Sequence, residues 1–69
     1  MEAYQQRVVD ELSNLSEKLT KLEEFILSDT FAGLNGLDRM LLLNQRRYMD
    51  GYLFTLEMRV EEFGDSDGR

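Results

Sequence analysis

The first part of the chain places apolar residues at steps that alternate between four and three. These positions are Val8, Leu12, Leu15, Leu19, Leu22 and Ile26. Such a spacing keeps the apolar side chains on one stripe of a helix, as in the a and d positions of a coiled coil. The pattern predicts a helix from about Glu2 to Leu27. Ser28 and Asp29, which follow, can end this helix or cap the next turn.

A second pattern of the same kind occupies the other half of the chain. Its seam positions are Leu42, Gln45, Met49, Tyr52, Leu56, Arg59 and Phe63. This spacing predicts a helix from about Asp38 to Phe63, with Asp38 near the N-cap and Gly64 as the C′ residue. Additional apolar residues beside the seam widen the apolar surface: Leu41, Tyr48, Leu53, Phe54 and Val60. One partner helix covers only one seam, so we expect other subunits to cover the rest.

The two predicted helices are joined by a short segment, Thr30 to Leu37. Its Gly33, Asn35 and Gly36 break helices and tolerate left-handed backbone conformations. We therefore predict an all-α fold, an antiparallel helical hairpin over residues 1–63, followed by a disordered polar tail over residues 64–69.

Chain length limits what such a hairpin can do alone. A core in a chain of 69 residues supplies roughly 3–5 kcal/mol, and the sequence has no Cys for a disulfide and no His for a Cys/His zinc site. Self-association into a homo-oligomeric helical bundle is the remaining common route to stability. No signal-peptide pattern is present, and the longest apolar run, Met40–Leu43, is too short to cross a bilayer. We expect a cytoplasmic protein.

Catalytic patterns have little support in this sequence. It contains no His, no Cys, no Ser in a Gly-flanked elbow and no phosphate-binding Gly loop before a helix. We predict that the protein is not an enzyme and uses no cofactor and no metal. The run Asp65–Gly68 resembles the start of a calcium loop but lacks the later Glu, so we attribute it to chance.

Polar residues on and beside the seams are the candidates for binding. Gln45 is interpreted as a register-setting residue, whereas Arg59 either pairs with a carboxylate or reserves a site for an anion. On the first helix, Tyr4 and Lys18 lie on one stripe but about 21 Å apart, so a small ligand that contacts both requires two subunits. Thr20 points roughly 200° away from Lys18 and would belong to a separate site.

Two alternative functions remain open from the residues alone. The first is a ligand-free structural or RNA-binding hairpin that dimerises into a four-helix bundle, with Arg7, Arg46 and Arg47 as its contact face. The second is an acidic decoy of nucleic acid, which the interspersed basic residues disfavour. The net charge of −6 argues against binding of long nucleic acid, because duplex binding requires many cations against phosphates.

Two stretches of the sequence resemble a known family over about residues 4 to 63. The first comprises residues 4–11, 15–22 and 25–26, with the sequences YQQRVVDE, LSEKLTKL and FI. The second is the pattern Leu42-Leu43, Gln45, Met49, Tyr52, Leu56 and Arg59-Val60. Together they resemble the helical-hairpin domain of phage-encoded sponges, which is shared by the anti-CBASS cyclic-oligonucleotide sponges and a class of Thoeris anti-defence proteins.

This resemblance implies a hexamer that binds cyclic nucleotide immune signals without hydrolysing them, in the cytoplasm of the infected bacterial host. It implies that Tyr4 and Lys18, together with Arg7, contact a cyclic dinucleotide between protomers. It implies that Thr20 and Arg59 contact a cyclic trinucleotide in a different pocket. The chain resembles the bare hairpin without the extra domain of a larger Thoeris antagonist, which argues against cyclic ADP-ribose binding but leaves it open.

Overall fold

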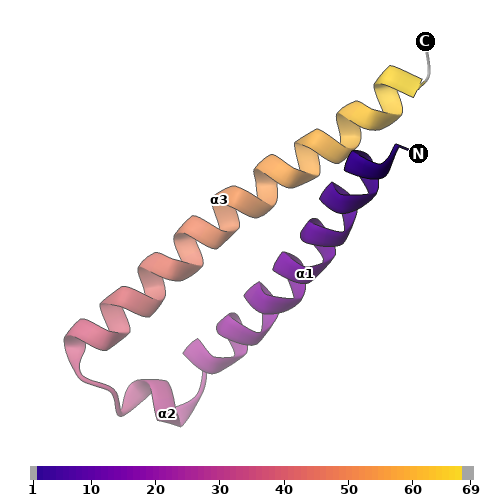
Figure 1. Ribbon diagram of the computed structural model, residues 1–69. Helices are drawn as coiled ribbons and strands as arrows, with labels where there is room; N and C mark the ends of the chain where they lie inside the picture. Colours follow the sequence, from indigo (N-terminus) through magenta and orange to yellow (C-terminus); the bar gives the residue numbers. More distant parts are fainter. Residues whose placement is uncertain (1, 68–69) are drawn as a thin grey trace.

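The structure, a computed structural model, describes residues 2–67 and forms a helical hairpin (Figure 1). Helix α1 spans Ala3–Ile26, the single turn α2 spans Asp29–Ala32, and α3 spans Gly36–Asp67. The long helices α1 and α3 run side by side in opposite directions, and both chain ends lie at the end of the hairpin away from α2. The molecule measures 52 × 15 × 14 Å. The predicted all-α hairpin is confirmed, and residues 2–67 contain no strand.

Hydrogen bonds at the start of each helix explain where it begins. The backbone N–H of Glu2 donates to Oε1 of Gln5 at 2.8 Å, and Gln5 is buried. The Ser28 hydroxyl accepts the backbone N–H of Phe31 at 3.2 Å, so Ser28 caps α2 as its side-chain chemistry predicts. These bonds satisfy amide donors that the first turn of a helix leaves without a partner.

The connection before α3 differs from the sequence prediction. Oδ1 of Asn35 accepts the backbone N–H of Asp38 at 2.8 Å, so Asn35 caps α3 and Asp38 lies inside its first turn. The left-handed conformations expected at Gly33, Asn35 and Gly36 are not used, because no residue described in the structure has a positive φ angle. Gly33 has φ −83° and ψ −7°, which is right-handed backbone.

Helix α3 extends past its predicted end. It continues through Gly64 to Asp67, so Gly64 is not the C′ residue. Residues 64–67 of the predicted disordered tail are therefore helical here, while Gly68 and Arg69 lie outside the described residues. The division into a hairpin domain and a tail stays a prediction.

The core between α1 and α3 is narrow. Val8, Leu19 and Leu56 are its buried apolar residues, and Leu56 is fully buried. The predicted seam of α1 is confirmed, because its remaining positions are all half-buried: Leu12, Leu15, Leu22 and Ile26. This core is one layer of side chains thick.

The predicted seam of α3 is wrong at three of its positions. Gln45, Tyr52 and Arg59 are exposed in the hairpin, whereas Leu53 and Val60 are half-buried. Leu53 and Val60 each lie one residue, or about 100° of helix rotation, after a seam position. Burying Leu53 and Val60 in place of Tyr52 and Arg59 avoids the desolvation of a phenol hydroxyl and a guanidinium, which is costly without partners. In the single chain, Arg59 is thus not a buried cation in need of a counter-charge.

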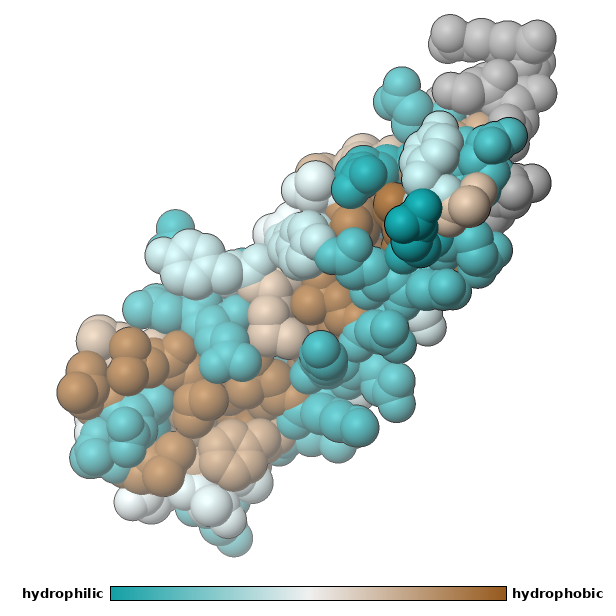
Figure 2. Space-filling view, viewed as in Figure 1, coloured by the Kyte–Doolittle hydropathy of each residue, from teal (hydrophilic) through white to brown (hydrophobic). Residues whose placement is uncertain are grey.

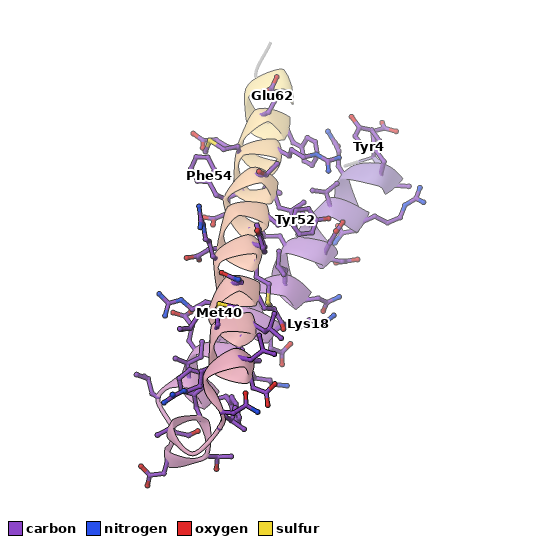
Figure 3. The ribbon with its side chains drawn as sticks, turned by 90° about the vertical axis from the view of Figure 1, so that its left-hand side faces the viewer. Tyr4, Lys18, Met40, Tyr52, Phe54 and Glu62 are labelled. Atoms are coloured by element: carbon purple, nitrogen blue, oxygen red, sulfur yellow. The ribbon has the colours of Figure 1, made fainter. Side chains whose placement is uncertain are left out.

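Several large apolar residues of α3 remain exposed in the single chain. Those exposed are Leu37, Met40, Leu41, Leu43, Tyr48, Tyr52, Phe54 and Met58. Figure 2 shows the apolar surface gathered toward the α2 end of the hairpin, while the opposite end is mostly hydrophilic. Figure 3 shows Phe54 projecting from the side of α3 that faces away from α1. No helix in the described part of the chain is long and apolar enough to cross a membrane.

Candidate ligand-binding groove

A shallow groove of about 350 Å³ runs along the junction of α1 and α3. Six of its lining residues come from α1 and one from α3: Arg7, Asp10, Glu11, Asn14, Leu15, Lys18 and Tyr52. Two cations, two carboxylates, an amide and an aromatic ring therefore surround one hollow. This mixture can contact an anionic ligand that also carries hydrogen-bonding and apolar parts.

The spacing of the α1 residues explains why they share this groove. Arg7, Glu11, Asn14 and Lys18 are separated by steps of four, three and four, which places them on one face of a helix. Arg7 and Lys18 lie about 16 Å apart along the helix axis, but both have long side chains. The structure brings these two predicted dinucleotide residues to opposite ends of the same groove.

The two carboxylates in the groove accept hydrogen bonds from residues other than Arg7 and Lys18. The Tyr52 hydroxyl donates to Oε1 of Glu11, and Nε2 of Gln6 donates to Oδ1 of Asp10 at 3.0 Å. Among the side chains that the structure describes, the one ion pair joins Lys21 and Glu17 at 3.9 Å, outside this groove. The charges of Arg7 and Lys18 are therefore available to an incoming anion.

Tyr4 does not line this groove. Its ring packs edge-to-face on Phe63, with ring centroids 5.8 Å apart and planes at 88°, and it remains 54% exposed. Figure 3 shows Tyr4 near the start of α1, well separated from Lys18. Within one chain, Tyr4 and Lys18 are too far apart to hold one small ligand, as their spacing in the sequence indicates.

Thr20 and Arg59 also lie apart in one chain. The Thr20 hydroxyl donates to the backbone carbonyl of Ser16 at 3.0 Å and is exposed. Arg59 lines a separate hollow of about 340 Å³ with neighbours from α3, among them Phe63. Measured from the contact of Glu11 with Tyr52, Thr20 lies toward α2 and Arg59 toward the chain ends, about 24 Å apart along the hairpin.

Tyr52 is the one groove residue from α3, and sequence reasoning did not assign it to a ligand site. Its place on the predicted seam assigned it to the core, but it is 46% exposed and reaches across to Glu11. A signal for this role exists in the sequence, because tyrosine combines an apolar ring with a hydroxyl that favours the edge of a core.

The arginines of the RNA-binding alternative do not share one face. Arg46 and Arg47 are exposed on α3 and lie roughly 120° and 140° around that helix from Tyr52. Arg7 borders the groove beside Tyr52. In a single chain the three guanidinium groups therefore do not form a continuous basic surface.

No cluster of three or more potential metal ligands occurs among the described residues. The calcium-like run at Asp65–Gly68 includes Gly68, which lies outside the described residues, and no ligand geometry is defined for it.

Comparison with known proteins places the chain in a family. The family model for Sequestin matches residues 2–62. A protein of Enterobacteria phage T4, described as "Uncharacterized 7.5 kDa protein in denB-rIIB intergenic region", is 36% identical over 63 residues, which cover 91% of this chain and 98% of the phage protein. No solved structure matches at a significant level. Both matches confirm the predicted resemblance to a phage-encoded family, and the chain belongs to the Sequestin family.

Proposed function

We propose that this protein sequesters cyclic oligonucleotide second messengers without hydrolysing them and thereby blocks CBASS-type antiviral signalling in the cytoplasm of the infected host. The family's name supports a sequestering role rather than a catalytic one. The observation that carries the proposal is that Arg7 and Lys18 line the same groove. Neither cation has an ion-pair partner among the described side chains.

Charge and shape of the groove suit a cyclic dinucleotide. Such a ligand carries two phosphodiester anions in a compact ring. Arg7 can contact phosphate oxygens through two parallel N–H bonds, whereas Lys18 supplies a compact point charge. The chain contains no His or Cys, the residue types that most often serve as base or nucleophile. This composition favours binding without bond cleavage over catalysis.

Assembly is the second part of the proposal. The hairpin exposes 5337 Å² of surface, whereas a compact folded monomer of 8.1 kDa exposes about 4,500 Å². Most of the large apolar residues that are exposed lie on α3, and their surface is what other subunits could cover. We propose a homo-oligomer larger than a dimer, a hexamer by the family resemblance, in which Tyr4 of a second protomer stacks on the ligand held by Lys18.

The same assembly provides a second site. Thr20 and Arg59 lie about 24 Å apart in one chain, so a ligand that contacts both requires two protomers. We propose that they form a pocket for a cyclic trinucleotide, separate from the groove that binds dinucleotides. Thr20→Ala and Arg59→Ala then weaken cyclic triadenylate binding and leave cyclic dinucleotide binding nearly unchanged.

Calorimetry on matched lysine variants tests the dinucleotide site. Lys18→Ala removes a charge-assisted hydrogen bond and is expected to weaken cyclic dinucleotide binding by about ten- to a hundredfold. Lys21→Ala is the control, because Lys21 pairs with Glu17 outside the groove. Unchanged affinity in a correctly assembled Lys18→Ala protein removes the groove from the proposal.

Competition tests the existence of two sites. A cyclic dinucleotide is titrated into protein already saturated with cyclic triadenylate, and separate pockets predict almost the same dinucleotide affinity as in free protein. Mutual exclusion of the two ligands means one shared pocket. A dimer that retains neither ligand supports the structural four-helix bundle instead.

A further inference from the structure

We infer that Tyr52 is a ligand-contacting residue of the groove, a stacking surface for a nucleobase, and that Glu11 holds its ring in position. The inference rests on the proposed function. It adds an aromatic surface from the same chain that supplies Arg7 and Lys18, in addition to the ring that a second protomer contributes.

Position along the groove is the first argument. Tyr52 pairs with Glu11, which lies four residues after Arg7 and seven residues before Lys18. At ~1.5 Å per residue, Glu11 is about 6 Å from Arg7 and about 10 Å from Lys18 along the axis. A ligand with anionic groups directed toward both cations therefore extends past the Tyr52 ring. Figure 3 shows Tyr52 on the side of α3 that faces α1.

Exposure of the ring is the second argument. Tyr52 is 46% exposed although its hydroxyl is bound to Glu11, so the uncovered part of the side chain includes the ring. Every base presents a π-face that can stack on an aromatic side chain, and a larger base stacks more strongly. An accessible ring between two cations matches the alternation of base and phosphate in a cyclic dinucleotide.

Restraint of the ring is the third argument. The bond from the Tyr52 hydroxyl to Glu11 joins α3 to α1, and an ionised acceptor makes it stronger than a neutral one. A ring already fixed in the free protein loses less conformational entropy when a ligand binds. Glu11 is thus a positioning residue, because its carboxylate accepts the hydroxyl that holds the Tyr52 ring.

A neighbouring hollow strengthens the assignment. Tyr52 also borders an apolar hollow of about 630 Å³ on α3, lined with Leu41, Tyr48 and Met49 among others. If another protomer fills that hollow, the ring is supported on the side away from the ligand. Tyr52 then lies between the assembly surface and the groove.

Variants of Tyr52 separate stacking from structural support. Tyr52→Leu removes the aromatic face, and we expect cyclic dinucleotide affinity to fall about tenfold or more. Tyr52→Phe keeps the ring but loses the hydroxyl, and we expect a loss of only about threefold. Lys21→Ala serves again as the control, because Lys21 is exposed, pairs with Glu17 and does not line the groove.

Two cyclic dinucleotides with bases of different size distinguish stacking from structural support. Loss of structural support alone should weaken both ligands equally. Tyr52→Leu should weaken cyclic diadenylate more than cyclic diuridylate, because a purine stacks over a larger area. Equal losses for both probes, or an unchanged affinity for both in a variant of wild-type mass, overturn the inference while the proposed function stands. Failure of the wild-type protein to bind either probe contradicts the proposed function as well.

Discussion

The two long helices of the hairpin distribute their apolar residues differently. Helix α1 concentrates them on the side that faces α3 and carries charged or polar residues elsewhere. Helix α3 has apolar residues around most of its circumference, and eight large ones stay exposed in the single chain. A helix with one apolar stripe needs one partner, whereas a helix that is apolar on several sides is usually buried on several sides.

This contrast suggests separate roles for the two helices. Helix α1 contributes six of the seven groove residues, so in the proposed function it is the helix that contacts the ligand. Helix α3 contributes the fully buried Leu56 toward α1, and its exposed apolar residues form the surface that we propose other protomers cover. The predictions below test this division by altering each surface in turn.

The largest effect is expected from the shared core. Leu19→Asp places a carboxylate at a position that is 4% exposed, which costs several kcal/mol and is comparable to the whole stability of a small domain. Circular dichroism should show loss of helix, and the assembly should dissociate together with it. Lys21→Asp, at an exposed site on the same helix, is the control and should stay folded. A Leu19→Asp protein with wild-type helix content contradicts the described core.

A smaller effect is expected on the outer surface of α3. Tyr48 and Phe54 are 72% and 63% exposed in the single chain, so replacing both by Ser in an isolated hairpin should change stability by only about 0.5 kcal/mol per site. If α3 packs on other protomers, the double variant loses buried aromatic area and the oligomer dissociates at micromolar concentration. Analytical ultracentrifugation measures the mass. An unchanged mass and melting temperature would show that these residues face solvent.

The smallest effect is expected at a glycine within α3. A Cβ at Gly51 meets nothing within 4 Å, so Gly51→Ala should stabilise the helix by about 0.5–1 kcal/mol. Gly64→Ala, also in open space in the same helix, is the matched comparison. Thermal melting measures both. If Gly51→Ala loses stability and Gly64→Ala does not, another chain packs closely against Gly51. The single hairpin has no such close contact at Gly51.

Prediction from sequence succeeded where a pattern has one interpretation. The seam of α1 and the all-α hairpin followed from spacing, because only one side of α1 is apolar. The seam of α3 was misassigned at Gln45, Tyr52 and Arg59, because apolar residues adjacent to the seam offered an alternative rotation that buries Leu53 and Val60. Spacing within one helix does not decide between such rotations.

The candidate site residues also differ in how far the sequence predicts their positions. Arg7 and Lys18 share a helix, so their common face could be calculated from the sequence alone. Tyr52 lies on the other helix, and its contact with Glu11 depends on how the helices align, which no local pattern encodes. The position of Asn35 as the cap of α3 likewise depended on which of two suitable residues begins the helix.

Recovery of intact ligand tests the proposed function most directly. The purified protein is incubated with a cyclic dinucleotide, separated from free ligand by filtration, and heated to release what it holds. The account predicts that the filtrate is depleted and that mass spectrometry of the released fraction recovers the cyclic dinucleotide unchanged and in full. An undepleted filtrate, or release of linear hydrolysis products, would contradict sequestration.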